Sequence, residues 1–291
     1  MDLFRDILLS IVYGITFLFP SSSTGNVRFF FNLTHTETDY VSFYIMFMRL
    51  AVLLVLLFVL RKDLIKNVIG LYQLILDVCS NVVIFFKKRF KGSKEEYYDI
   101  NSDLHKKKVY YMCLSCLTMA LVSKVFSSVA ANCASINMFI AVANVLSGVL
   151  FLIVFRMKKG RWSSEKFNEG HALIAGAIAG IGIIPGFSRM ALMVSAICFM
   201  GFKQGYAFKY FCHTMIIFII TSTLYNVVSL EGTSFAVSGF GNLIAGMIVC
   251  GCVAFLSYKV VFAMSRRERL REISLLSVGF AVIEIIIAII K

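Results

Sequence analysis

The sequence predicts an all-helical protein that crosses a membrane several times, and three observations support that prediction. Of its 291 residues, 59% are hydrophobic and only 15% are charged, a composition too apolar for an ordinary soluble or disordered chain. Several uncharged windows reach the roughly 20 residues that a helix needs to span a bilayer. The chain contains only 2 prolines, and each lies in an apolar stretch close to serine residues.

Eight apolar stretches follow one another along the chain. Six of them are uninterrupted, and each is long enough to predict a transmembrane helix. Their approximate residues are 41–60, 109–129, 136–155, 206–228, 239–261 and 273–290. The other two stretches, residues 3–31 and 171–200, are broken near their centres by Pro20 and Pro185.

Each broken stretch predicts a re-entrant hairpin. Proline lacks an amide donor and clashes with the preceding helical turn, and small polar residues favour turns. Serines, a threonine and a glycine follow Pro20, whereas Gly186, Ser188 and Arg189 follow Pro185. Non-helical backbone survives at membrane depth only where protein or a water-filled cavity covers it. We therefore expect two helix–break–helix hairpins, each of which enters and leaves the membrane on one side.

The basic residues are distributed unevenly between the expected loops. With both hairpins re-entrant, the basic loops 61–108, 156–166 and 259–272 fall on one side, and the opposite loops 130–135 and 229–238 contain no lysine or arginine. This positive-inside pattern predicts that the basic loops are cytoplasmic. The formal net charge of +13 is explained by membrane topology, and we expect no nucleic-acid partner.

The order of the elements repeats. A hairpin followed by three spans occurs in residues 1–155 and again, inverted, in residues 156–291. Inverted repeats of this kind place a functional site near the midplane, where the broken helices meet. The first copy has an extra segment, residues 63–86, with its polar residues on one helical face. We expect an interfacial amphipathic helix there, and a seventh span is the alternative. The predicted fold is six transmembrane helices plus two re-entrant helical hairpins.

The residues that follow the two breaks predict an anion site. Hydroxyl groups and free amide groups at the helix start after Pro20 attract phosphate. Arg189 opens the helix after the second break, and its planar guanidinium suits phosphate. An arginine inside a bilayer is costly unless it is paired or functional. The alternative interpretation is structural: the serines cap broken helices, and Arg189 binds main-chain carbonyls.

The run from Tyr13 to Asn26 reads Tyr-Gly-Ile-Thr-Phe-Leu-Phe-Pro-Ser-Ser-Ser-Thr-Gly-Asn. It resembles the first signature of the bacterial undecaprenyl-diphosphate phosphatases, the bacitracin-resistance family, which is Glu-Gly-x-Thr-Glu-Phe-Leu-Pro-x-Ser-Ser-Thr-Gly-His. The run Pro-Gly-Phe-Ser-Arg at 185–189 is similar to the second signature, Pro-Gly-x-Ser-Arg-Ser-Gly. Motif order, spacing and the predicted plan agree over essentially the whole chain.

The resemblance implies an integral enzyme of the bacterial plasma membrane that dephosphorylates undecaprenyl diphosphate to the monophosphate carrier used in peptidoglycan synthesis. It implies that Ser23 is the nucleophile and that Arg189 clamps the phosphate. The further residues expected to bind phosphate are Ser22, Thr24, Gly25, Asn26, Gly186 and Ser188. The oligomeric state is left open, a homodimer included.

Five positions that are polar or glycine in the family pattern have a different residue here. Tyr13 and Phe17 stand where the family has glutamates, Asn26 stands where it has histidine, and Met190 and Ala191 replace its Ser-Gly. The glutamates and the histidine are the groups that would bind a metal or move protons. The resemblance implies a divalent cation, but its ligands are missing from this sequence. The alternative function is a non-catalytic binder or translocase of polyprenyl phosphates that uses the same pocket.

Two charged residues lie inside predicted spans, Arg49 in the first and Glu284 in the last. An ionisable residue at this depth is a functional hypothesis that requires a partner. We expect either that Arg49 and Glu284 pair or that Arg49 adds a second phosphate contact. The cysteines predict no metal site, because the CxxC pair Cys113 and Cys116 has no second pair or histidine cluster beside it.

Overall fold

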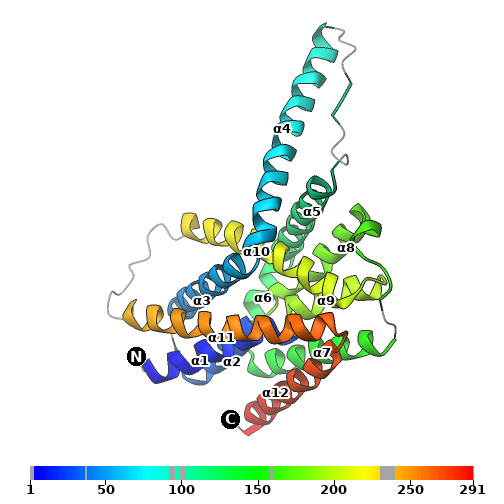
Figure 1. Ribbon diagram of the computed structural model, residues 1–291. Helices are drawn as coiled ribbons and strands as arrows, with labels where there is room; N and C mark the ends of the chain where they lie inside the picture. The colour runs from blue at the N-terminus through cyan, green and yellow to red at the C-terminus, as the bar shows by residue number, and fades with distance from the viewer. Residues whose placement is uncertain are drawn as a thin grey trace.

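The described part of the chain folds into helices, as the computed structural model in Figure 1 shows. It comprises residues 3–36, 38–91, 96–98, 103–157, 160–229 and 240–290. The α-helices are α1 (Leu3–Thr16), α2 (Ser23–Leu33), α3 (Thr38–Val59), α4 (Arg61–Lys91), α5 (Leu104–Val125), α6 (Ser127–Cys133), α7 (Asn137–Met157), α8 (Glu169–Gly180), α9 (Arg189–Phe199), α10 (Gln204–Ser229), α11 (Phe240–Arg266) and α12 (Leu270–Ile290). Two 3₁₀ helices are η1 (Ser164–Lys166) and η2 (Ile181–Ile183). Apart from Ser229, the predicted loop 229–238 lies outside the described residues.

Seven helices within the described residues are long and apolar enough to cross a membrane. Six of them, α3, α5, α7, α10, α11 and α12, coincide with the six predicted spans. The seventh is α4, which contains the segment 63–86. The prediction of an all-helical polytopic membrane protein is therefore confirmed.

Both broken stretches form a pair of short helices. In the first, α1 ends at Thr16 and α2 begins at Ser23, with Pro20 between them. In the second, α8 continues into η2, and α9 begins at Arg189 after the break at Pro185. The two α-helices of each pair pack against one another. The helix breaks therefore lie where the prolines and small polar residues predict them.

A serine caps the second helix of each pair. The Oγ of Ser22 accepts a hydrogen bond from Gly25 N at 3.1 Å, and the Oγ of Ser188 accepts one from Ala191 N at 3.2 Å. Both serines have the extended backbone of an N-cap residue. The amide-rich starts of α2 and α9 therefore lie at the two breaks.

Helix α4 packs on α5 and extends beyond the other helices. It is 31 residues long, and Figure 1 shows it extending away from the rest of the molecule. Most of its side chains are not covered by protein. Two ion pairs connect it to neighbours: Asp63 Oδ2 lies 2.8 Å from Lys209 Nζ of α10, and Asp77 Oδ2 lies 2.7 Å from Lys106 Nζ of α5.

The contacts between helices follow a regular pattern. Helix α1 packs on α11 and α8 packs on α5; α3 packs on α11 and α10 packs on α5; α7 and α12 pack on each other. Glycines allow two of these close approaches. A Cβ at Gly14 of α1 would lie 2.8 Å from Cys250 O of α11, and a Cβ at Gly176 of α8 would overlap Ser115 O of α5.

We expect the substitution Gly176→Ala to lower the thermal stability of the protein in detergent. The added methyl group would overlap Thr118 Oγ1 and Ser115 O, so α5 must move away from α8. Overpacking of this kind costs about 1–3 kcal/mol. Gly170→Ala on the same helix is the control, because its Cβ would meet only Asn168 Oδ1, at 3.5 Å. Equal melting temperatures for the two variants would contradict this account of the α5–α8 contact.

Candidate functional site

The two helix breaks meet in the interior of the protein. The Oγ of Ser22 accepts a hydrogen bond from Gly186 N at 3.3 Å, and Ser188 Oγ donates to Phe19 O at 3.4 Å. The crossing requires glycine, since a Cβ on Gly25 would lie 2.5 Å from Gly186 N. Gly186 also has a φ of 99°, a left-handed conformation that other residues rarely adopt. Two segments that are far apart in the sequence thus form one junction.

Helix α7 contributes one polar side chain to each break. The Oδ1 atom of Asn144 accepts hydrogen bonds from Ser21 Oγ and Ser22 N, both at 3.1 Å. One turn further along α7, Ser147 Oγ accepts a hydrogen bond from Ser188 N at 3.1 Å. Residues three apart lie on the same face of a helix. One face of α7 therefore forms hydrogen bonds with both breaks.

The carboxylate of Glu284 on α12 completes this polar network. It is only 1% exposed, and its Oε2 accepts a hydrogen bond from Asn144 Nδ2 at 2.9 Å. With its amide nitrogen facing Glu284, Asn26 donates to Oε1 at 3.1 Å and to Ser22 O at 2.9 Å. Within the described residues Glu284 forms no ion pair with Arg49. The expected Arg49–Glu284 pair is therefore replaced by two asparagine amides, because α12 packs on α7.

We expect Asn144→Leu to destabilise the protein, because it removes hydrogen-bond partners from Ser21, Ser22 and Glu284. A buried polar group left without a partner costs about 1–3 kcal/mol, and a charged group costs more. The double variant Asn144→Leu/Glu284→Leu should recover part of the lost stability, since it also removes the stranded carboxylate. Thermal unfolding in detergent measures both variants. A double variant that is less stable than the single one would show that Asn144 does not act mainly on Glu284.

A small cavity opens at the junction of the breaks. Its volume is about 20 Å³, which is enough for about one water molecule. Eight of the residues that the motifs single out line it: Tyr13, Phe17, Ser22, Ser23, Thr24, Ser188, Arg189 and Met190. Gly25, Gly186, Asn26 and Arg49 are not among the lining residues; the two glycines form the crossing, and Asn26 belongs to the Glu284 network. A phosphate group therefore enters only if lining side chains move.

Arg189 supplies a positive charge at the start of α9. Its Cζ lies 4.8 Å from the centre of the Phe218 ring of α10. Gly182 leaves room for its side chain, since a Cβ there would lie 2.5 Å from Arg189 Cγ. The buried Nε has no hydrogen-bond partner among the described residues. Arg189 therefore brings an unused donor to the wall of the cavity.

Arg49 lies near Arg189, and Arg28 lies near Arg49. Arg49 of α3 is within electrostatic reach of Arg28 on α2, of Arg189 and of the Tyr13 side chain. Ser23 also lies beside Tyr13, whose buried hydroxyl has no partner in good hydrogen-bonding geometry among the described residues. Across the described ranges, none of the three arginines has a carboxylate within ion-pair distance. Like charges in a protein interior repel one another, so this cluster favours an anion.

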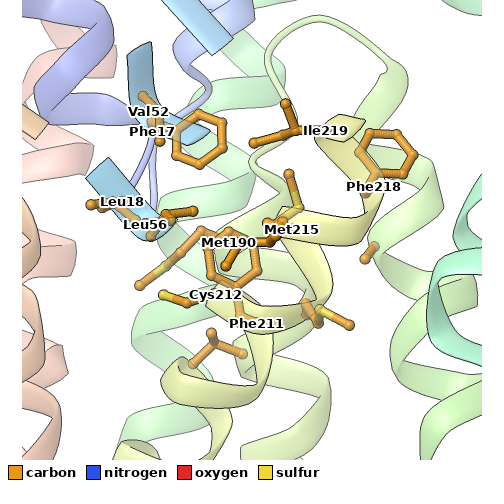
Figure 2. Close-up of a cluster of buried hydrophobic side chains, with 14 of the residues drawn as sticks. Phe17, Leu18, Val52, Leu56, Met190, Phe211, Cys212, Met215, Phe218 and Ile219 are labelled. Atoms are coloured by element: carbon orange, nitrogen blue, oxygen red, sulfur yellow. The ribbon is translucent and has the colours of Figure 1, made fainter. Parts of the chain in front are cut away.

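Part of the cavity wall is apolar. Phe17 and Met190 line it together with Phe211 and Met215 of α10. Figure 2 shows these side chains gathered in one buried hydrophobic cluster. Phe17 stands where the resembled signature has glutamate, and Met190 stands where it has serine. Two groups that would contact water, a proton or a metal are therefore replaced by hydrophobic packing.

Comparison with known protein families assigns the chain to one of them. The sequence model of the bacitracin resistance protein BacA family matches residues 6–288, nearly the whole chain. The chain belongs to this family. It is a multi-pass membrane protein, as its apolar helices also indicate.

Its relatives include three undecaprenyl-diphosphatases. The protein of Alkaliphilus metalliredigens is 22% identical over 258 residues, which cover 88% of this chain and 86% of the relative. The protein of Oceanobacillus iheyensis is 27% identical over 210 residues, covering 70% and 66%. The protein of Methanobrevibacter smithii is 24% identical over 211 residues, covering 72% and 71%.

The donor groups of the cavity do not fit the divalent cation that the family resemblance implies. Such a cation takes mainly carboxylate oxygens as charged ligands, and the described residues contain no group of three or more His, Cys, Asp or Glu. Asp6 of α1 is held by Arg5 at 3.1 Å and by the Tyr40 hydroxyl, and Glu284 is held by asparagines. The charged side chain that does line the cavity is Arg189, a cation.

Three polar residues at or near the junction lie outside the two signature motifs: Arg28, Asn144 and Ser147. Each is a polar residue in an apolar stretch, which is the signal that identifies functional or structural positions in membrane helices. Asn144 and Ser147 are one turn apart in the third predicted span. That spacing alone predicts a shared face but not which break the face contacts.

Proposed function

We propose that this member of the BacA family binds the diphosphate head group of undecaprenyl diphosphate at the junction of the two breaks and releases its terminal phosphate. The observation that carries the proposal is the cluster of Arg28, Arg49 and Arg189, which lacks carboxylate partners in the described chain and lies beside two serine-capped helix starts. A diphosphate supplies the missing negative charge. Helix starts and guanidinium groups both favour phosphate.

In the proposed reaction the Oγ of Ser23 attacks the terminal phosphorus. The bond to the bridging oxygen breaks, and undecaprenyl monophosphate leaves. The Ser23 proton passes to a non-bridging oxygen of the transferred group, because the neutral side chains of Tyr13 and Asn26 are not ordinary bases. Water then hydrolyses the phosphoserine. Phosphoryl transfer depends chiefly on positioning and charge stabilisation, which Arg189 and Arg49 supply.

A second candidate function is binding or translocation of polyprenyl phosphates without hydrolysis. It is favoured by the replacement of both family glutamates by Tyr13 and Phe17, and by the position of Asn26 in the Glu284 network. General acid–base catalysis is typically worth about 10²–10⁴-fold in rate. Without general acid–base catalysis, the same pocket binds the head group and hydrolyses the diphosphate slowly or not at all.

Phosphate release separates the two functions. The purified protein in detergent is incubated with undecaprenyl diphosphate, alongside the double variant Ser23→Ala/Arg189→Ala. We expect slow release by the parent protein and none above background by the variant. Binding without release by the parent would replace hydrolysis by the second candidate. Equal release by parent and variant would remove Ser23 and Arg189 from the reaction.

We further propose that residues 1–155 and 156–291 form inverted repeats with two re-entrant hairpins and six spans. The helix contacts support this arrangement. The helices α1, α2, α3, α5 and α7 of the first repeat correspond, in that order, to α8, α9, α10, α11 and α12 of the second. Under this correspondence the α1–α11 contact is equivalent to the α8–α5 contact, and the α3–α11 contact is equivalent to the α10–α5 contact. Helices α4 and α6 lie outside this correspondence. We assign α4 to the membrane interface, because a seventh span would move the basic residues that follow it to the other side.

In this topology the basic loops face the cytoplasm of a bacterial cell, and the protein lies in its plasma membrane. The loops 61–108, 156–166 and 259–272 carry the basic residues, and topology follows lysine and arginine in short loops. Cysteine labelling from outside the cell tests the orientation. Ser135 and Arg267 are each replaced by cysteine in a cysteine-free background. We expect the cysteine at position 135 to be labelled and the cysteine at position 267 not to be labelled.

A further inference from the structure

A second, larger cavity lies beside the first. Its volume is about 620 Å³, within the ~300–1,000 Å³ range of ligand pockets. Helices α7, α8 and α9 form it, and ten of its twelve lining residues are aliphatic or aromatic. The two exceptions are Ser147 and Ser195. We call this cavity the α7–α9 groove.

The groove is continuous with the junction of the breaks. Phe187 lines both cavities. Ser147 lines the groove, and its Oγ also accepts the hydrogen bond from Ser188 N. One end of the groove therefore lies against the start of α9, where Arg189 stands.

One face of α9 forms the length of the groove. Leu192, Ser195, Ala196 and Phe199 line it, and their spacing of three and four residues places them on a single helical face. From Arg189 to Phe199 the helix rises about 15 Å. The groove therefore leads away from the phosphate-binding end along the axis of α9.

The outer rim of the groove is exposed. Phe199 is 71% exposed, and Leu150 of α7 is 41% exposed. In a membrane these side chains face the acyl chains of lipids. The lining residues of α7 extend from Leu146 to Val154, toward the end that carries Arg156. The groove therefore opens sideways, in the half of the membrane next to the basic loops.

We propose that the α7–α9 groove holds the first isoprene units of the polyprenyl tail while the diphosphate head group lies at the junction of the breaks. The inference rests on the proposed function and identifies where the tail of its substrate lies. A polar ligand would lose its hydration in this cavity and would find few polar groups there to replace the lost hydrogen bonds. The neighbouring 20 Å³ cavity is too small for a tail. An amphiphile with an anionic head and a long apolar chain matches the positive charge at the junction and the apolar lining of the groove, and Phe187 lies where head and tail would join.

Two substitutions that narrow the groove test this placement. Leu150→Trp enlarges a side chain at the exposed rim, and Ala196→Phe fills the interior. Val282→Trp on α12 is the matched control, since Val282 is 44% exposed and does not line the groove. Binding of undecaprenyl monophosphate, of inorganic pyrophosphate and of dipalmitoyl phosphatidic acid is measured for each protein in nanodiscs.

We expect Leu150→Trp to weaken undecaprenyl monophosphate binding by about tenfold, because it excludes buried apolar chain, and to leave pyrophosphate binding unchanged. Ala196→Phe should act in the same direction, and Val282→Trp should change neither. Unchanged undecaprenyl monophosphate binding in Leu150→Trp overturns the placement. Equal weakening of pyrophosphate overturns it too, and equally tight phosphatidic acid binding by the parent replaces the isoprenoid by an ordinary lipid. A parent protein that binds none of the three probes instead refutes the proposed function itself.

Discussion

Replacing Arg189 with methionine is expected to weaken pyrophosphate binding by about 30-fold or more. The guanidinium lies over the Phe218 ring, and its buried Nε has no partner among the described protein groups. Removing one member of a buried charge pair costs about 2–5 kcal/mol, and about 1.4 kcal/mol corresponds to a tenfold change in affinity. Arg189→Lys should restore only part of the affinity, because lysine lacks the planar fork that binds two phosphate oxygens.

Arg49 and Arg28 should contribute to the same binding in decreasing order. Arg49 is within electrostatic reach of Arg189 and Tyr13, whereas Arg28 interacts with Arg49. Isothermal titration of Arg49→Met and Arg28→Met with pyrophosphate, at low and high salt, measures each contribution. Arg161→Met is the control, since Arg161 is exposed and does not line the cavity. Equal losses in the control and in Arg189→Met would mean that the arginine cluster acts only through net charge.

Much of the fold follows from local features of the sequence. Apolar length predicts the six spans, and Pro20 and Pro185 predict the two breaks, because a bilayer and a proline each impose a strong local constraint. Ser22 and Ser188 similarly predict caps. The contact between the two breaks does not follow from such local features. It depends on the close approach of Gly25 and Gly186, which the inverted-repeat pattern suggests but local sequence does not fix.

The hydrogen-bond partners of Glu284 could not be predicted from the sequence. Opposite charge suggested Arg49, but charge does not determine which helix faces which. Helix α12 packs on α7, so the carboxylate meets Asn144 and Asn26 instead. Arg49 lies near Arg189, and its contact with a phosphate stays a prediction. The polar character of single residues inside spans was readable from sequence, whereas their pairing required the helix packing.

Restoring the family residues should produce the largest gain of function. We expect the triple variant Tyr13→Glu/Phe17→Glu/Asn26→His to release phosphate from undecaprenyl diphosphate about 10²–10⁴-fold faster than the parent, the range that general acid–base catalysis supplies. Tyr13 and Phe17 both line the cavity. A carboxylate at position 13 would lie near Arg49, and a protonated histidine at position 26 would lie near Glu284, so these two new groups gain a neighbour of opposite charge.

The matched control carries glutamine at positions 13 and 17 with Asn26 unchanged. Glutamine offers the size and polarity of glutamate without a proton-accepting carboxylate. The triple variant should also become dependent on added Mg²⁺, because two carboxylates give a hard cation the oxygen ligands that the parent cavity lacks. Adding Ser23→Ala to the triple variant should abolish the gain. A glutamine control as fast as the triple variant would show that cavity polarity, rather than proton transfer, limits the reaction. A triple variant that folds, binds undecaprenyl diphosphate and still releases no phosphate would mean that the arginine-rich junction holds the lipid in a non-reactive position, as the non-catalytic function requires.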